Sequence, residues 1–395
     1  MKLLHTSDWH LGQNFMGFSR KEEHQAFLDW LLQTIEKEKI ELLIVAGDIF
    51  DTTTPPNYAL ELYFNFLTNV AQTSCKKVVI VAGNHDSVAV LQSSKELLKQ
   101  LNIEVIVTGD ETEEEIVPLY DANQELEAIV CGVPFLRDYV VRKSQSAQSL
   151  SQKEQTLTLG IQQHYKELYA KALQLKKEKS IPIIATGHLT TLGAKTSDSE
   201  RDIYIGGTLN LNSNFLAQMF DYTALGHLHI NQQVGAVNVY YSGSPIPLSF
   251  GESLNKKVNI VTFMQRECEV QKVEIPLYRE LVVLKGSKEQ ILEKLETIKG
   301  NKTWIEVRLR DDNIFEANRI IRQRVEELKL TLLALKIETQ NAHLEKDDFN
   351  VVSLDELTPL EVFYKRLEKE NLEDEALKED LVKSFREILD EVQNR

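Results

Sequence analysis

The chain has 395 residues, more than the roughly 100 to 200 residues of one ordinary domain, so we expect two or three domains. Its 42% hydrophobic and 27% charged residues are close to a globular average, which excludes disordered and fibrous classes. The net charge of −15 argues against a broad surface that coats nucleic acid.

The negative charge is unevenly spread along the chain. Residues 341–395 hold 16 acidic and 8 basic residues, which gives −8, whereas residues 142–179 hold 8 basic and 3 acidic residues, which gives +5. The basic stretch is explained either as a solvated helix face or as a DNA contact. The net charge therefore does not exclude a polyanionic substrate.

The cysteines and the apolar runs bear on the compartment. Three cysteines, Cys75, Cys131 and Cys268, occur without a C-x-x-C motif, which excludes a disulfide framework and a thiolate zinc site. No stretch approaches the ~18 apolar residues that span a bilayer, and the first residues lack the apolar core of a signal peptide. We therefore expect a cytoplasmic protein that is neither exported nor inserted in a membrane.

The first 275 residues alternate short apolar runs with helical stretches such as 22–37 and 58–69. This alternation is typical of sheets covered by helices. Each apolar run is bounded by Gly or a polar residue, as in strands that are buried on both faces. The predicted strands are Lys2–His5, Leu42–Ala46, Val78–Ala82, Ile181–Ala185 and Tyr222–Leu225.

After Pro276 the pattern changes to a small βαβαβ unit. Residues 341–395 then hold two amphipathic helical patterns, the first with Thr358 as N-cap and Pro359 at the first helical position. The strands of the small unit are predicted at 281–285, 304–309 and 330–337, with helical runs that end at Lys299 and Leu328.

Polar side chains follow all five strands predicted in the first 275 residues. The carboxyl ends of parallel strands meet at one edge of an α/β sheet, where such folds place their sites. In four motifs a Gly precedes the polar residue, which allows a sharp turn and close approach of backbone to a ligand. The motifs are Asp8-Trp9-His10, Gly47-Asp48, Gly83-Asn84-His85-Asp86, Gly187-His188 and Gly226-His227-Leu228-His229.

These motifs supply more ligands than one catalytic metal ion takes from protein. We predict two ions that share one carboxylate, with Asp48 as the natural bridge, an arrangement suited to displacement at phosphorus. Mixed oxygen and imidazole donors suit Mn, Fe or Zn better than Mg. The predicted metal ligands are Asp8, His10, Asp48, Asn84, His188, His227 and His229.

Each motif also has a structural explanation, because Asp often caps a helix after a strand. One motif alone is weak evidence for a metal site, but five in succession favour it. His85 is left over from the ligand count and is the predicted catalytic residue, which protonates the leaving oxygen or stabilises the transition state. Asp86 either orients His85 or caps the next helix, and His5 is expected to be a structural strand residue.

The order of these motifs resembles that of the calcineurin-like metallophosphoesterases. Longer strings resemble the bacterial SbcD nuclease family, which is related to the archaeal and eukaryotic MRE nucleases. They are LHTSDWHLGQN at 4–14, VAGDIFD at 45–51, ATGHLTT at 185–191, RDIYIG at 201–206 and YSGSPIPLSF at 241–250.

This resemblance implies a Mn-dependent DNA nuclease in DNA end processing, repair and recombination. The implied activities are a 3′-to-5′ exonuclease on duplex ends and an endonuclease on hairpins and single strands, both controlled by an SbcC-type ATPase. It assigns one ion to Asp8, His10, Asp48 and His229, and the other to Asp48, Asn84, His188 and His227. His85 matches the catalytic histidine, whereas a second helper histidine of archaeal relatives is replaced by the stretch Phe50-Asp51-Thr52.

The predicted fold is an α/β metallophosphoesterase sandwich of the four-layer type, with sheets covered by helices. We divide the chain into a nuclease domain at 1–275, an α+β capping, DNA-binding domain at 276–340 and a helical SbcC-binding tail at 341–395. The alternatives are a phosphomonoesterase or cyclic-nucleotide phosphodiesterase, and a non-catalytic scaffold, which should have lost ligands. A small-molecule enzyme needs no cap or acidic tail.

Two apolar patterns predict partners. The helix at 58–69 carries apolar residues on two sides, which is explained by deep burial or by a homodimer beside the active site. In the tail, two helical stripes either pack on the cap or bind SbcC as helices in a groove. The stripes are Leu60, Tyr63, Phe64 and Leu67, with Leu62 and Phe66 on the second side; Leu360, Phe363, Tyr364 and Leu367; and Leu377, Leu381, Phe385 and Leu389.

Overall fold

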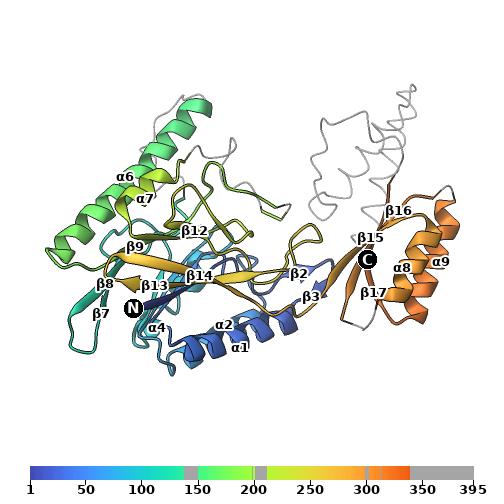
Figure 1. Cartoon of the computed structure of the whole chain (residues 1–395), viewed down its shortest axis with the longest axis horizontal. Helices are drawn as coiled ribbons and strands as arrows, with labels where there is room; N and C mark the ends of the chain where they lie inside the picture. The colour runs from blue at the N-terminus through green and yellow to red at the C-terminus, as the bar shows by residue number, and fades with distance from the viewer. Residues whose placement is uncertain (138–149, 198, 201–210, 299–301, 312, 339–395) are drawn as a thin grey trace, which may run out of the picture. The chain divides into compact units, whose positions relative to one another are not determined.

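Two six-stranded sheets lie at the centre of the computed structural model (Figure 1). The structure describes residues 1–137, 150–197, 199–200, 211–298, 302–311 and 313–338. The chain divides into two units, Met1–Glu338 and Thr339–Arg395. The two predicted tail helices fall in the second unit and lie outside the described residues.

The first sheet has the strand order β14-β13-β1-β4-β5-β6. Its strands β1, β4, β5 and β6 run parallel, and the hairpin of β13 and β14 adds two antiparallel strands beside β1. The bounds are β1 Lys2–Thr6, β4 Leu42–Ala46, β5 Lys77–Val81, β6 Ile103–Ile106, β13 Lys257–Met264 and β14 Glu267–Glu274.

The second sheet has the order β11-β12-β10-β9-β8-β7. Strands β8, β9, β10 and β12 are parallel, whereas the outer strands β7 and β11 are antiparallel to their neighbours. The bounds are β7 Ile116–Tyr120, β8 Leu126–Cys131, β9 Ile183–His188, β10 Tyr222–Gly226, β11 Gln232–Gln233 and β12 Val239–Tyr241.

Alternate residues of the strands point to opposite layers. In β1, Leu4 packs in the core shared with the helices, whereas Leu3 packs in the core between the two sheets. Figure 1 shows α1 and α2 on one side of the strands and α6 and α7 on the other. The predicted four-layer sandwich is confirmed. These helices are α1 Lys21–Glu38, α2 Asn57–Val70, α6 Leu150–Lys176 and α7 Asn214–Met219, with short turns at α3 Val88–Gln92 and α4 Lys95–Lys99.

Some predicted strand ends differ from the structure. The strand expected to end at Ala185 continues to His188, because Gly187 and His188 still pair with Leu225 and Gly226 of β10. His188 is therefore the last residue of a strand, and its backbone is held by pairing with Gly226 of β10. The hairpin of β13 and β14 was not predicted, although its apolar residues complete the core between the sheets.

The small βαβαβ unit has the predicted element order. Its three strands form a parallel sheet, and the buried residues of the two helices share one core with it. Ser287 begins the first helix with a capping box in which Gln290 is the partner. The elements are β15 Leu281–Gly286, α8 Lys288–Thr297, β16 Trp304–Leu309, α9 Ile314–Glu327 and β17 Thr331–Ile337.

A short hairpin beside the first ligand loop contacts this unit. It consists of β2 Asn14–Phe15 and β3 Phe18–Ser19. The ring of Phe15 stacks on that of Trp304, with centroids 5.8 Å apart. Both parts belong to the first unit of the chain, so the predicted boundary at residue 275 stays a prediction.

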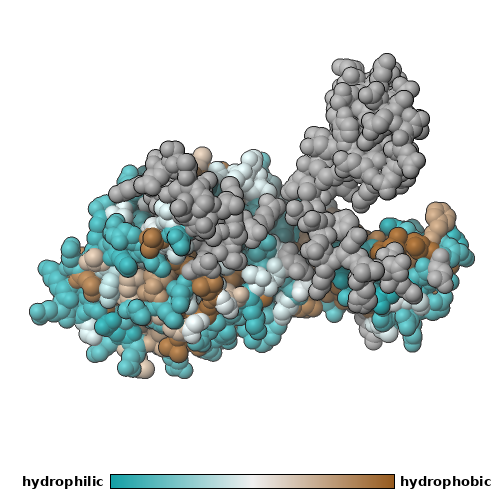
Figure 2. Space-filling view, turned by 90° about the horizontal axis from the view of Figure 1, so that it is seen from above, coloured by the Kyte–Doolittle hydropathy of each residue, from teal (hydrophilic) through white to brown (hydrophobic). Residues whose placement is uncertain are grey.

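The exposed apolar side chains are dispersed. Figure 2 shows a surface that is largely hydrophilic on the face in view, with separate apolar areas. Of the most exposed large apolar side chains, Leu97, Leu159 and Phe315 lie on three different helices, whereas Met264 lies at the end of β13. None of the described helices is long and apolar enough to cross a membrane.

Candidate metal centre

The backbone turns sharply after the strands that carry the predicted ligands. Four of the ligand residues have positive φ angles, namely 52° for Asp8, 47° for His10, 49° for Asp48 and 95° for His227. Residues other than Gly rarely adopt this region, and such residues cluster at functional sites. The turns bring side chains from both sheets to one edge.

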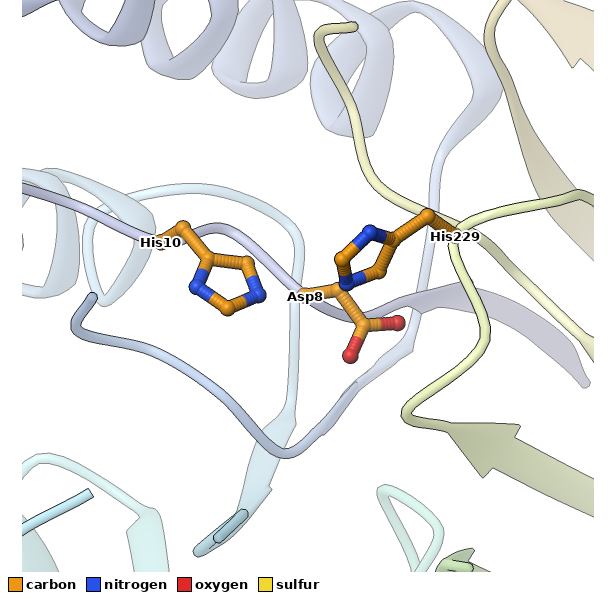
Figure 3. A group of neighbouring side chains, drawn as sticks. All are labelled: Asp8, His10 and His229. Atoms are coloured by element: carbon orange, nitrogen blue, oxygen red, sulfur yellow. The ribbon is translucent and has the colours of Figure 1, made fainter. Parts of the chain in front are cut away.

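The first group of side chains consists of Asp8, His10 and His229. One possible ligand atom of each lies within 4.8 Å of the others, and all three side chains are buried. Figure 3 shows the three side chains pointing toward one another. Asp8 is held in place, because its carboxylate accepts hydrogen bonds from Ser7 Oγ at 2.6 Å and from the main-chain N of His227 at 2.8 Å.

The second group consists of Asp48, His188 and His227, with ligand atoms also within 4.8 Å of one another. His188 donates from Nδ1 to the main-chain O of Ala46 at 3.0 Å, which directs Nε2 into the group. The Oδ1 atom of Asn84 lies 2.9 Å from this Nε2. Asn84 therefore adds an amide oxygen to the second group.

The carboxylate of Asp48 lies between the two groups. Its Oδ2 atom is 3.2 Å from Nε2 of His188 and 3.7 Å from Nε2 of His10. A Cβ atom at Gly83 would collide with this carboxylate, so the loop after β5 needs Gly at that position. A Cβ atom at Gly47, where φ is 88°, would collide with the ring of His188.

The donors fit divalent metal ions. Among the residues that the structure describes, none forms a hydrogen bond with the buried Nε2 of His10, and an unpaired buried nitrogen is costly unless a ligand takes its lone pair. Two oxygen-donor carboxylates and one amide accompany four imidazoles, and no cysteine is among them. This set suits borderline transition metals rather than Mg²⁺.

The charged groups of the site shift one another's pKa values. Burial lowers the pKa of His188, but the carboxylates of Asp48 and Asp8 outweigh burial and raise the pKa to about 9. Burial raises the pKa of Asp48, but His188 and His10 outweigh it and hold the pKa well below its usual value. Burial lowers the pKa of His227 to about 3. Metal binding at His188 would therefore release a proton.

His85 lies beside the first group and is half-buried. Its main-chain N donates to Asp48 Oδ1 at 2.9 Å, and its Nδ1 donates to the main-chain O of Asp51 at 2.7 Å. The rings of His85 and His10 are 4.9 Å apart between centroids. The predicted catalytic histidine is thus held at the edge of the group by loops from two strands.

The structure places Asp86 between the loops that carry Asp48 and Asn84. Its buried carboxylate accepts main-chain hydrogen bonds from Gly83 at 2.8 Å, Ile49 at 3.2 Å and Phe50 at 2.9 Å. Ser87, not Asp86, caps α3. Burial and the charge of Asp48 raise the pKa of Asp86 to about 6. The Asp86 carboxylate therefore joins the two ligand loops, and its predicted catalytic role stays a prediction.

Two acidic residues near the ligands were missed by sequence reasoning. The carboxylate of Asp51 lies 3.1 Å from Nδ1 of His10, while its carbonyl holds His85. Glu252 lies 3.5 Å from Nδ1 of His229 and is only 9% exposed. The position of Asp51, three residues after Asp48, could have indicated from the sequence that it lies near the site. No sequence feature indicated this for Glu252.

Two histidines outside the ligand set, His5 and His164, make structural contacts. His5 is buried between the sheets, with Nδ1 2.9 Å from Tyr222 Oη and Nε2 3.1 Å from the main-chain O of Leu225, as expected of a strand residue. His164 pairs with the buried Glu115 at 2.7 Å. It lies on α6, so part of the basic stretch is a helix packed on the second sheet.

Two family models match this chain. The calcineurin-like phosphoesterase model matches residues 1–231, more than half of the chain. A second model, the type 5 capsule protein repressor C-terminal domain, matches residues 277–371.

Curated relatives match over most of the chain. The SbcD component of the nuclease SbcCD from Escherichia coli K12 is 41% identical over 95% of this chain and 94% of its own length. The SbcD component from Bacillus subtilis is 28% identical over 90% of this chain and 91% of its own. A dimetal phosphatase from Danio rerio has 13% identity and a TM-score of 0.42, over 70% of this chain and 99% of its own, too remote for a functional argument.

The resemblance seen in the motifs is therefore confirmed at the level of the family. The whole-length match to the SbcD relatives and the phosphoesterase match at the site agree with each other. The chain belongs to the SbcD nuclease family, whose members are metal-dependent phosphodiesterases of the calcineurin-like type.

Proposed function

We propose that this chain is a Mn-dependent DNA nuclease with two activities. These are a 3′-to-5′ exonuclease on duplex ends and an endonuclease on hairpins and single strands, used in DNA end processing, repair and recombination. The observation that carries the proposal is the position of Asp48 between two groups of ligand side chains, with His85 beside them. Membership of the SbcD nuclease family supports DNA as the substrate.

We assign the predicted ligands to two divalent ions. Asp8, His10 and His229 would hold one ion, and Asn84, His188 and His227 would hold the other, with Asp48 shared. When bound, two such ions supply Lewis acidity and a nucleophile for hydrolysis at phosphorus. The mixture of imidazole and oxygen donors favours Mn²⁺ over Mg²⁺.

His85 would act on the leaving oxygen or on the charge that develops at phosphorus. A carbonyl oxygen only accepts hydrogen bonds, so Nδ1 of His85 carries the proton shared with Asp51. Nε2 is then the nitrogen that would take up a second proton and transfer it. The half-buried position of the ring leaves it accessible to a substrate.

The partners follow from the family. The curated relatives are named as components of the SbcCD nuclease, so we propose an SbcC-type ATPase as the partner that couples ATP to cleavage. We keep the three-part division of the chain, with a nuclease domain at 1–275, a DNA-binding cap at 276–340 and a partner-binding tail at 341–395. The second family model, at 277–371, supports a separate C-terminal part.

We also propose a homodimer and a cytoplasmic location. On α2, the side chains of Leu60 and Phe64 are partly exposed, which leaves a short apolar strip on the helix that follows the loop of Asp48. The three cysteines, Cys75, Cys131 and Cys268, are all free, as expected in a reducing compartment.

The same metal centre would serve a phosphomonoesterase or a cyclic-nucleotide phosphodiesterase. A non-catalytic scaffold is disfavoured, because every predicted ligand is retained at the site. The small βαβαβ unit and the nuclease relatives favour a polymeric substrate.

One gel assay tests the proposal. The chain is incubated with Mn²⁺ and blunt duplex, hairpin or single-stranded DNA, with and without an SbcC-type ATPase and ATP. We expect cleavage in Mn²⁺ that the partner and ATP extend on duplex ends and hairpins. Hydrolysis of p-nitrophenyl phosphate or a cyclic nucleotide, with intact DNA in every lane, would contradict the proposal.

A further inference from the structure

His229 is anchored at three points by residues outside the ligand set. Its Nδ1 lies 2.6 Å from Oγ of Ser199, and its main-chain N donates to Oε1 of Glu200 at 2.7 Å. Its main-chain O accepts a hydrogen bond from Nζ of Lys256 at 3.1 Å. The ring and the backbone of this residue are therefore both fixed.

Glu252 lies at the centre of these contacts. Its Oε1 accepts a hydrogen bond from Ser199 and lies 3.5 Å from Nδ1 of His229. Its Oε2 pairs with Lys256 and accepts from the main-chain N of Leu248 at 3.2 Å. Both Glu252 and Lys256 are less than 10% exposed, so this pair is shielded from water.

The carboxylate dictates the direction of the hydrogen bonds. An ionised carboxylate only accepts, so the hydroxyl of Ser199 donates to Glu252. The oxygen of Ser199 then has lone pairs but no proton for His229. Nδ1 of His229 must therefore carry a proton itself, which makes Nε2 the ring nitrogen available to an ion.

We propose that Glu252 is a positioning residue of the metal centre, which acts through Ser199 to hold His229 in the Nδ1–H tautomer. This inference rests on the proposed function, since it assumes that His229 binds an ion through Nε2. A carboxylate that orders a metal-binding histidine raises the affinity of the site without touching the ion. Lys256 balances the buried charge of Glu252 and fixes the carbonyl of the same histidine.

The competing explanation is that Glu252 and Lys256 form a structural ion pair only. The two explanations differ in the substitution Glu252→Gln, which keeps the size of the side chain. A Gln amide can donate to Ser199 and reverse the chain of hydrogen bonds, which would place the proton on Nε2 of His229. A structural role predicts a change of stability without a change of tautomer.

Ser199 supplies a second, milder test. Ser199→Ala interrupts the link and leaves the pair of Glu252 with Lys256 intact, so the chain should fold as the wild type does. Ser199→Thr keeps the hydroxyl and should behave as the wild type. Ser253→Ala is the matched control, because Ser253 is next to Glu252 and its Oγ accepts only from the main-chain N of Asn255 among the described hydrogen bonds.

Two measurements test these variants, one of the tautomer of His229 and one of the affinity for Mn²⁺. In the metal-free chain, ¹⁵N and ¹³C NMR of the imidazole should show His229 protonated at Nδ1 in the wild type and Ser199→Thr, but not in Glu252→Gln or Ser199→Ala. In calorimetric titration with Mn²⁺, Glu252→Gln and Ser199→Ala should bind one ion about 10- to 100-fold more weakly than the wild type. Their affinity for the other ion should be unchanged.

The outcomes separate the two proposals. If the wild type binds two ions, and Glu252→Gln and Ser199→Ala keep both the tautomer and both affinities, Glu252 is not a positioning residue and the proposed function stands. If the wild type binds no Mn²⁺, the proposed function fails and this inference fails with it. Weakening of both sites in Ser199→Ala would also overturn the inference, because His229 is the predicted ligand that Ser199 contacts in the described part of the chain.

Discussion

The main-chain oxygen of Asp51 lies 2.7 Å from Nδ1 of His85. A carbonyl oxygen cannot donate, so this contact fixes Nδ1 as one protonated nitrogen of His85 and makes Nε2 the position for a second proton. The contact comes from the main chain, so it persists when the side chain of Asp51 is changed. His85 is therefore oriented by the loop that also carries Asp48.

The first prediction concerns His85. His85→Ala should keep both ions and lower turnover by about 10² or more, the usual scale for loss of proton transfer or charge stabilisation. Calorimetric titration with Mn²⁺ and a cleavage assay on single-stranded DNA measure the two effects separately. Loss of an ion in this variant would mean that His85 is a metal ligand.

The second prediction concerns Asp48. Asp48→Ala should abolish turnover and weaken both ions, because its carboxylate faces Nε2 of both His188 and His10. The control is Glu61→Ala, an exposed carboxylate on α2 that should leave binding unchanged. Two intact Mn²⁺ sites in the Asp48 variant would refute the bridging role.

The positions of the ligands could be predicted from sequence because each lies at the end of a strand or within a few residues after it. The pattern of buried strands, together with the rule that parallel strands end at one edge of a sheet, was sufficient to predict Asp8, Asp48 and His188. The turn at each strand end then decides the direction of the side chain, and the positive φ angles there could not be read from the pattern.

The residues behind the ligands could not be predicted, because their contacts join distant parts of the chain. Asp51 reaches His10 only because Leu11 pairs with Phe50 and aligns the two loops. Glu252 and Ser199 are 53 positions apart, and no local period relates them. Such contacts depend on how the loops fold over the sheet edge.

The environment of the apolar residues on α2 could not be predicted from the sequence either. Its apolar residues on two sides were explained by burial or by a dimer, and the structure buries Leu62, Tyr63, Phe66 and Leu67 within the core of the first sheet. Most of the two-sided pattern is therefore intramolecular burial. Periodicity alone could not show this, because a core and an interface have the same apolar composition.

The third prediction concerns the dimer and uses the apolar positions that remain. Leu60→Glu combined with Phe64→Lys should convert the chain from dimer to monomer at micromolar concentration, because only these two side chains of the predicted face are partly exposed. Analytical ultracentrifugation measures the state. Leu159→Glu, at a 65% exposed position of α6, is the control and should remain dimeric. A monomeric wild type would remove the dimer from the proposal.

The fourth prediction concerns stability at low pH. Burial lowers the pKa of His5 to about 3, whereas an unfolded histidine has a pKa of about 6.5. The unfolded chain therefore takes up the proton first, and the contribution of His5 is full above pH 6.5 and is lost as the pH falls toward 3. At pH 5.5 the loss is about 1.4 kcal/mol.

The substitution His5→Gln tests whether His5 makes the chain less stable as the pH falls. A Gln amide can still donate to Leu225 and accept from Tyr222, but it does not titrate. Urea unfolding at pH 7.5 and 5.5 should show that the wild type loses about 1.4 kcal/mol more than the variant over this interval. An equal loss in both proteins would mean that His5 is protonated within the fold.

The fifth prediction concerns the tail, residues 341–395, which lies outside the described residues. Its net charge of −8, from 16 acidic and 8 basic residues, would suit a basic partner surface, and its two apolar stripes are typical of helices that bind in a groove. Deletion of the tail should leave Mn²⁺-dependent cleavage of single-stranded DNA largely intact. It should abolish copurification with SbcC and stimulation by ATP.

Point variants distinguish the contribution of the first apolar stripe to SbcC binding from that of the rest of the tail. In the full chain, Phe363→Glu places a charge on the first stripe, whereas Lys365→Glu places the same side chain off it. Copurification with SbcC should be lost in the first and kept in the second, since burial of the apolar face would drive the docking. If the deletion variant still copurifies with SbcC at full yield, the partner binds elsewhere on residues 1–340.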